Sequence, residues 1–185
     1  MRYNELDMLE QRTFTVDDLT LMDEAGLFGG QRIELINGVI FEMSPTGPSH
    51  AHTVDVLTEE FVQQFAGRAR VRVQSPVSLN DENWMPIPDI TLIKLGDYSG
   101  KHPIPKDILL LVEVSSTTLK TDLGAKLEAY ASAGIADYWI ADLNTDEWII
   151  HRDPAPGRYR SITRLDFSES VAPQAFAEDT RRWLA

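Results

Sequence analysis

Residues 88–130 read PDITLIKLGDYSGKHPIPKDILLLVEVSSTTLKTDLGAKLEAY, two apolar strand-like runs followed by a helical pattern. Asp89 opens the first run. The second run, Ile108 to Val114, is apolar except for Glu113, which is typical of a central strand covered on both faces. An ionised carboxylate in such a strand needs a partner, and a divalent cation is the strongest one available. Asp89 and Glu113 are therefore the first candidates for a site.

A lysine follows on the helix that we expect to begin at about Thr121 or Asp122. The apolar stripe of this helix consists of Leu123, Leu127 and Tyr130. Lys126 falls on the edge of that stripe, one turn from Tyr130, so its ammonium can be drawn toward the protein body. The alternative is a helical ion pair with Asp122, worth a few tenths of a kcal/mol. Both interactions can exist at once.

Length and composition indicate one soluble globular domain spanning residues 1–185, with 43% hydrophobic and 25% charged residues. No stretch approaches the roughly 18 uncharged apolar residues of a membrane span. The N-terminal sequence MRYNELDMLEQRTF lacks the apolar run of a signal peptide. The absence of cysteine excludes disulfides and thiolate chemistry. These features favour a cytoplasmic location.

The charge balance opposes general DNA binding. Lysine and arginine total 17 and aspartate and glutamate total 29, which gives a net charge of −12. Proteins that bind nucleic acids gain much of their affinity from basic residues that displace counterions from phosphates. A local basic groove, a bound divalent metal or a partner would have to overcome the repulsion.

The segment RIELINGVIFEM, residues 32–43, predicts a hairpin with its turn at Asn37-Gly38. In this register Glu34 pairs with Phe41, and the residues that share its face are Ile36, Val39 and Met43. A carboxylate buried on so apolar a face needs a partner or a metal. A site role for Glu34 therefore competes with a structural ion pair to an arginine such as Arg32.

Two histidines stand near the start of the helix that we expect from about Ser49 to Phe65. Residues two apart on a helix point away from each other, so His50 and His52 are poor joint metal ligands. His50 could still reach an active site or a phosphate. A surface or capping histidine is the commoner alternative.

Three arginines, Arg68, Arg70 and Arg72, lead into the strand ARVRVQSPVSL and lie on one of its faces. This stripe could meet a phosphate backbone, although a solvated edge strand is its commoner meaning. Further along, DYWIADL and EWIIHR predict a second hairpin and RYRSITRL another strand, and AEDTRRWL predicts a terminal helix over 177–184. The fold class that results is α/β, a mixed sheet flanked by helices.

Several of these motifs resemble a known nuclease superfamily. Pro88-Asp89 followed by Glu113-Val114-Ser115 resembles the PD-(D/E)XK superfamily, which has the restriction-endonuclease-like fold. A closer resemblance is to its Uma-two family, and it extends from about Arg32 to His151. The segments that carry it are RIELINGVIFEMSPTGPSH, PDITLI, LLLVEVSS, the spaced Asp122, Lys126 and Tyr130, and GIADYWIAD.

The resemblance implies a central mixed sheet and a site for Mg²⁺ or Mn²⁺ held by Asp89, Glu113 and the backbone carbonyl of Val114. The superfamily's usual lysine stands two residues after the glutamate, and here Ser115 occupies that position. The resemblance suggests that Lys126 takes its place from the following helix.

Further residues match the family pattern. Glu34 corresponds to the extra acidic residue that many members carry. His50 and Tyr130 match without a role that the sequence assigns.

The resulting hypothesis is a Mg²⁺-dependent endonuclease that hydrolyses DNA phosphodiester bonds. A binding or interaction module that keeps the fold without efficient catalysis is the alternative, motivated by the acidic charge and the displaced lysine. Hydrolysis of a small phosphorylated substrate suits the acidic surface but lacks a specificity motif. A homodimer is compatible with the superfamily, many of whose members cut as pairs.

Overall fold

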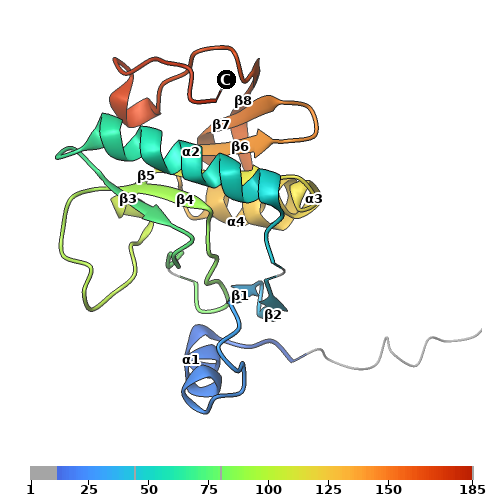
Figure 1. The fold of residues 1–185 in the computed structure, drawn as a ribbon. Helices are drawn as coiled ribbons and strands as arrows, with labels where there is room; N and C mark the ends of the chain where they lie inside the picture. The colour runs from blue at the N-terminus through green and yellow to red at the C-terminus, as the bar shows by residue number, and fades with distance from the viewer. Residues whose placement is uncertain (1–11, 44, 80, 185) are drawn as a thin grey trace, which may run out of the picture.

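A six-stranded mixed sheet forms the centre of the protein in the computed structural model, which describes residues 12–43, 45–79 and 81–184 (Figure 1). Residues 1–11, which make up most of the N-terminal segment expected not to be a signal peptide, lie outside the described residues. The strand order is β3-β4-β5-β6-β7-β8. The strands are β3 (Arg70–Val73), β4 (Ile90–Ile93), β5 (Ile108–Ser115), β6 (Asp137–Asp142), β7 (Glu147–Ala155) and β8 (Arg158–Asp166). The expected mixed sheet flanked by helices is confirmed.

Strand β5 is the apolar run expected to be central. It pairs antiparallel with β4 and parallel with β6, and the parallel pair requires a crossover connection. That crossover consists of a short helix α3 (Leu119–Thr121), a π-helical turn η3 (Asp122–Lys126) and helix α4 (Leu127–Ser132). Because Ile90 pairs with Val112, Asp89 precedes β4 beside Glu113. Sheet register therefore brings the two candidate acids together.

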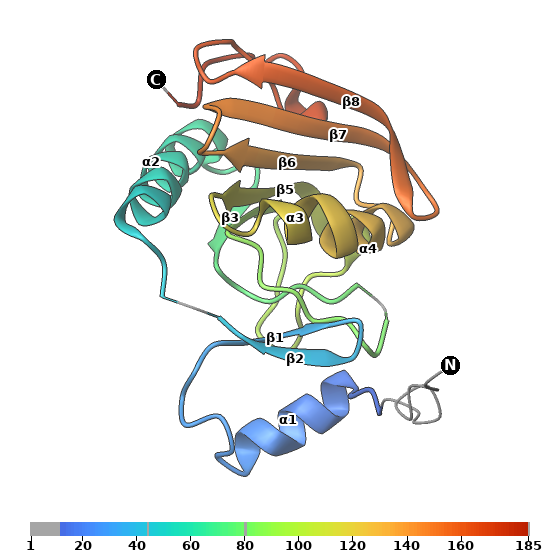
Figure 2. The same ribbon diagram turned by 90° about the vertical axis from the view of Figure 1, so that its right-hand side faces the viewer.

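The two faces of the sheet are covered by different parts of the chain (Figure 2). Helix α2 (Pro48–Phe65) and the C-terminal segment, with Trp183, pack on one face. The η3 turn and α4 pack on the other, where Tyr130 and Tyr138 are buried. Side chains alternate along β5, so Glu113 points toward η3 and α4. The crossover that connects β5 to β6 thus also covers the candidate glutamate.

A two-stranded sheet lies beside this body together with helix α1 (Val16–Glu24) (Figure 2). Its strands are β1 (Ile33–Ile36) and β2 (Val39–Glu42), and the expected pairing of Glu34 with Phe41 is confirmed. The turn residue Gly38 has a φ of 72°, and an added Cβ would clash with the side chain of Thr13. Only glycine fits there, which fixes the hairpin register.

The structure contradicts the expected C-terminal helix and shows where the arginine-bearing strand lies in the sheet. Residues 177–184 do not form a helix; the chain is irregular there, with a bridge between Val171 and Arg181, because Trp183 is buried in the core. Arg70 and Arg72 lie on β3, which is an edge strand of the sheet. Within the part of the chain that the structure describes, no helix has the length and apolarity needed to cross a membrane.

Candidate active site

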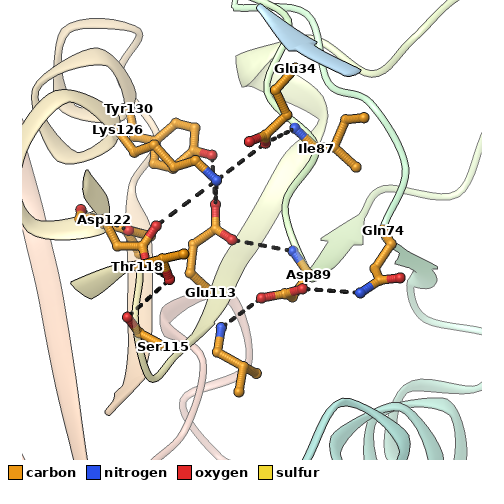
Figure 3. A network of polar contacts seen from close by, with 12 residues as sticks. Glu34, Gln74, Ile87, Asp89, Glu113, Ser115, Thr118, Asp122, Lys126 and Tyr130 are labelled. Atoms are coloured by element: carbon orange, nitrogen blue, oxygen red, sulfur yellow. Dashed lines mark hydrogen bonds and ion pairs between the residues drawn. The ribbon is translucent and has the colours of Figure 1, made fainter. Parts of the chain in front are cut away.

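Glu113 lies at the centre of a buried polar network (Figure 3). Its Oε1 accepts hydrogen bonds from Lys126 Nζ at 3.1 Å and from the Tyr130 hydroxyl at 2.9 Å. Its Oε2 faces the backbone N–H of Asp89, with 3.4 Å between Oε2 and the nitrogen. One side of the carboxylate is therefore saturated by donors, and the other faces Asp89.

Lys126 points into the protein, with only 6% of the residue exposed. Besides Glu113, its Nζ lies 3.2 Å from Glu34 Oε1 and 3.9 Å from Asp122 Oδ1. Burial acts to lower the pKa of Lys126, but Glu113, Glu34 and Asp122 outweigh burial and raise it above its ordinary value. The amine is therefore a permanent cation at neutral pH.

Asp122 and Lys126 are four residues apart on the η3 turn, so they face the same side of the helix, and both are buried. Gly124, which lies between them, has φ −107° and ψ −108°, outside the helical region, and the chain is kinked there. Thr118 holds Asp122 by donating a hydrogen bond of 2.7 Å to Oδ2.

Glu34 reaches the network from strand β1. Its Oε1 accepts a 2.7 Å hydrogen bond from the backbone N–H of Ile87 as well as the contact with Lys126 (Figure 3). Arg32, the alternative partner of Glu34 expected from the sequence, donates a hydrogen bond to Gln74 Oε1 instead. The carboxylate on the apolar hairpin face is therefore paired with the site lysine.

Asp89 is held by three groups. The backbone N–H of Val114 donates to Oδ2 at 2.9 Å, and a 3.0 Å hydrogen bond joins Oδ2 to His50 Nε2. Gln74 Nε2 lies 3.3 Å from Oδ1. Gln74 has a φ of 44°, a left-handed conformation that costs a non-glycine residue roughly 1 kcal/mol or more and is concentrated at functional sites. The bond to Asp89 raises the pKa of His50 against its partial burial.

Charge is unbalanced within the network. The network holds four buried carboxylates and the single ammonium of Lys126, which contacts three of them, Glu34, Glu113 and Asp122; the fourth is Asp89. Burial raises the pKa of Glu113 well above its usual value, although Lys126 opposes the shift. Burial likewise raises the pKa of Asp122. The acids are thus short of positive charge, and they must acquire protons or another cation.

The donor set fits a small hard cation. Mg²⁺ commonly takes one or two protein carboxylates, with waters and substrate oxygens completing its shell. Asp89 and Glu113 are neighbouring carboxylates beside the backbone of Val114, and the one ammonium nearby, that of Lys126, is shared with two other acids, Glu34 and Asp122. Among the residues that the structure describes, no three His, Asp or Glu side chains form a ready-made metal cluster. The fit is therefore to a cation that keeps most of its waters.

The network borders a cavity of about 740 Å³. One wall comes from the β1–β2 hairpin and the loop after it, and the other from the exit loop of β5 and from α3. Asp89, Glu113, Asp122 and Lys126 all line it. The buried charges are thus reachable by a ligand.

Most of the residues singled out from the sequence converge here. Asp89, Glu113, Lys126, Glu34, His50 and Tyr130 all belong to the network. Ser115 joins the network at its edge: its hydroxyl lies within hydrogen-bonding distance of Thr118, which bonds to Asp122, and it does not contact Glu113 (Figure 3). His52 is exposed on the far side of its helical turn.

Sequence reasoning missed two members of the network. From the sequence, Asp122 is a helical partner of Lys126 and one residue of the family motif, without a site role, and Gln74 is not a candidate. The four-residue spacing between Asp122 and Lys126 was a usable signal, whereas nothing in the sequence marks Gln74.

Comparison with known proteins agrees with this architecture. A solved structure described as a "putative nuclease belonging to DUF820" from Anabaena variabilis ATCC 29413 has a TM-score of 0.68 and 15% sequence identity, covering 92% of this chain and 95% of that one. At that identity the likeness shows the fold. No curated protein matches the chain. The Uma2 family model, described as "Putative restriction endonuclease", matches residues 17–184. The chain therefore belongs to the Uma2 family, the Uma-two family that its motifs resemble.

Proposed function

We propose that this protein is a Mg²⁺-dependent endonuclease that hydrolyses DNA phosphodiester bonds at the cavity bordered by Asp89, Glu113 and Lys126. The observation that carries the proposal is the buried network itself, in which four carboxylates and one inward-facing ammonium border a cavity large enough for a nucleotide. Membership of a family described as restriction endonucleases supports it.

Asp89 and Glu113, with the carbonyl of Val114, would hold the metal. Mn²⁺ is the other candidate ion. When bound, such a cation supplies Lewis-acid stabilisation of phosphoryl charge and activation of a water. Glu113 Oε2 and Asp89 Oδ1 are suited to this because each has at most one donor, and that donor is distant.

Lys126 acts as a fixed positive charge rather than a base. Its raised pKa keeps it protonated, so it cannot take a proton from water at neutral pH. Its position suits it to stabilise negative charge that develops on the phosphate in the transition state. Glu34 holds Lys126 in place through their ion pair, and Tyr130 holds Glu113 in place by donating a hydrogen bond to it.

His50 and Gln74 act on Asp89. Each is within hydrogen-bonding distance of one of its carboxylate oxygens, so together they fix the rotation of that carboxylate. Substituting a residue that orients a metal ligand in this way typically lowers metal affinity or activity by roughly 10- to 100-fold. Neither residue needs to touch the substrate.

The test is nicking of supercoiled plasmid with Mg²⁺, with Mn²⁺ and with EDTA. Asp89→Asn and Lys126→Met should each abolish nicking that the wild type shows with metal. Matched controls are Asp153→Asn, in an exposed ion pair on β7, and Lys106→Met, an exposed lysine, and both should nick normally. Absence of wild-type cleavage of both this plasmid and circular single-stranded DNA under the same conditions, or equal nicking by Asp89→Asn, would refute the proposal.

The second candidate is a binding module without efficient catalysis. It is favoured by the net charge of −12 and by Ser115 standing where the superfamily has its lysine. Calorimetry distinguishes the two, because the endonuclease should bind Mg²⁺ in a manner that depends on Asp89 and Glu113. We also propose that the protein acts as a homodimer, for which light scattering is the direct measurement.

A further inference from the structure

The wall of the cavity opposite the β5 exit loop is one face of the β1–β2 hairpin. Glu34, Ile36, Phe41 and Met43 all line the cavity, and the register places them on the same side. Glu34 is buried at the base of this face, whereas its partner Phe41 is 47% exposed. The hairpin therefore presents an acid at depth and an aromatic ring toward the opening.

The exposure of Phe41 is unusual in this chain. Seven large hydrophobic side chains are exposed among the described residues: Leu21, Leu27, Phe41, Val62, Val73, Leu95 and Ile162. Of this set, Phe41 alone is aromatic and alone lines the cavity that contains the acids. An exposed ring loses the benefit of burial, so its place beside a charged site points to a ligand with a flat apolar face.

The opposite wall has a different chemistry. Ser116, Thr117 and Thr121 offer hydroxyl groups, and Lys120 is exposed there with no ion pair in the part of the chain that the structure describes. Between the two walls lie the carboxylates and Lys126. The cavity thus combines an aromatic side, a hydrogen-bonding side with a positive charge, and a floor suited to a phosphate bound with a cation.

We propose that Phe41 stacks on the base of an unpaired nucleotide next to the phosphate at the Asp89–Glu113 site, so that the substrate is single-stranded DNA. The inference rests on the proposed nuclease function and narrows its substrate. Bases in a duplex are already stacked on one another, and only an unpaired base offers a free face to an aromatic side chain.

The charge of the chain agrees with a single strand. Duplex DNA carries one negative charge per about 1.7 Å of its axis, whereas a single strand carries about half that density. A protein with a net charge of −12 is therefore repelled less by a single strand. Stacking, which is insensitive to salt, then supplies affinity that phosphate contacts cannot.

The experiment is fluorescence anisotropy of a short labelled DNA oligonucleotide, single-stranded and in its duplex, with metal-free protein in EDTA. We expect the wild type to prefer the single strand, and Phe41→Ala to weaken that binding by about 5- to 100-fold, since stacking is worth roughly 1–3 kcal/mol per base. Phe41→Leu should resemble Phe41→Ala because it keeps an apolar group without a ring. Phe41→Trp should bind at least as well as the wild type.

Ile162→Ala is the matched control, because Ile162 is a 59% exposed apolar residue on β8 outside the cavity. It should bind as the wild type does. Wild-type preference for the duplex, or equal binding by the wild type, Phe41→Ala and Phe41→Leu, would overturn the inference.

Binding and cleavage separate this inference from the proposed function. Phe41-dependent binding of the single strand without Mg²⁺-dependent cleavage of either single-stranded DNA or plasmid would retain the inference and refute the nuclease. Metal-dependent cleavage that is as fast on duplex as on single strand, and unchanged by Phe41→Ala, would refute the inference and retain the nuclease.

Discussion

Replacing Lys126 with methionine removes a cation from a buried cluster while keeping most of its volume. The ammonium lies 3.1 Å from Glu113 and 3.2 Å from Glu34, and Asp122 is 3.9 Å away. After the substitution these carboxylates keep their hydrogen bonds to the Ile87 N–H, Tyr130 and Thr118 but lose their common counter-ion.

The cost follows from the imbalance of charge. Removing one partner of a buried ion pair typically destabilises a protein by about 3–5 kcal/mol, because the other charge is left uncompensated. Here three carboxylates depend on one amine, so the upper part of this range applies. For a chain of this size the loss corresponds to a fall in Tm of roughly 10 °C or more.

The loss should grow as pH rises. A carboxyl whose pKa is raised in the folded state, as burial raises that of Glu113, binds its proton more tightly there than in the unfolded chain. Folding is then favoured at low pH, and stability falls once pH exceeds the unfolded pKa of about 4.3. Because Lys126 lowers the pKa of Glu113, the variant has a still higher value and a wider window of loss.

Urea denaturation in EDTA at about pH 5 and about pH 8 measures this, with buried Trp139 and Trp148 as fluorescence probes. Lys106→Met is the control, since Lys106 is exposed and should change stability by less than about 0.5 kcal/mol. Added Mg²⁺ should restore part of the lost stability of Lys126→Met. A loss below about 1 kcal/mol at pH 8, or an equal loss at both pH values, would show that the amine does not neutralise the cluster.

Three further substitutions test the rest of the framework. Asp137→Ala should cost about 3–5 kcal/mol in urea denaturation, because this fully buried carboxylate accepts from Arg152, the Trp139 indole and the backbone N–H of Gln174. The indole and the N–H lose their partner, and Arg152 loses its counter-ion but keeps its bond to the Ala172 carbonyl. Gln74→Gly should change stability by less than about 1 kcal/mol, since glycine adopts the positive φ of this position without strain. It should nevertheless lower plasmid nicking about 10- to 100-fold, because Asp89 loses a residue that orients it. Unchanged nicking would show that Gln74 is not part of the site. Tyr130→Phe should destabilise the metal-free protein by about 1–3 kcal/mol, and a neutral result would mean that its hydroxyl bond to Glu113 contributes nothing.

The central part of the site was predictable because it violates local rules. Glu113 interrupts an otherwise apolar strand, and Glu34 interrupts an apolar hairpin face, so each required a partner wherever the chain placed it. The Asn37-Gly38 turn fixed the hairpin register, and with it the face that Glu34 shares with Phe41. The alternation of side chains along a strand and the cost of burying a charge were sufficient to predict that these two glutamates belong to a site.

Other members depend on geometry that periodicity does not encode. Asp122 shares a helix face with Lys126 through its four-residue spacing, but that spacing encodes neither the kink at Gly124 nor the burial of the pair. Gln74 follows the end of β3 in a left-handed conformation that no local signal demanded. Trp183 reads as part of a helix, yet it is buried on the sheet in an irregular segment, because tertiary packing outweighs local propensity.

The acidic composition and the nuclease proposal conflict only when charge is counted over the whole chain. In the site, four carboxylates against one ammonium leave three uncompensated negative charges when all the acids are ionised and His50 is neutral. Burial raises the pKa of Glu113 and Asp122, so in the metal-free protein these acids hold protons more readily than they would in water. Under the proposed function, a divalent cation would compete with protons for these acids, and its binding would release protons. The local excess of acid would then create a place for the cation, and the phosphate would meet that cation rather than a bare acidic surface.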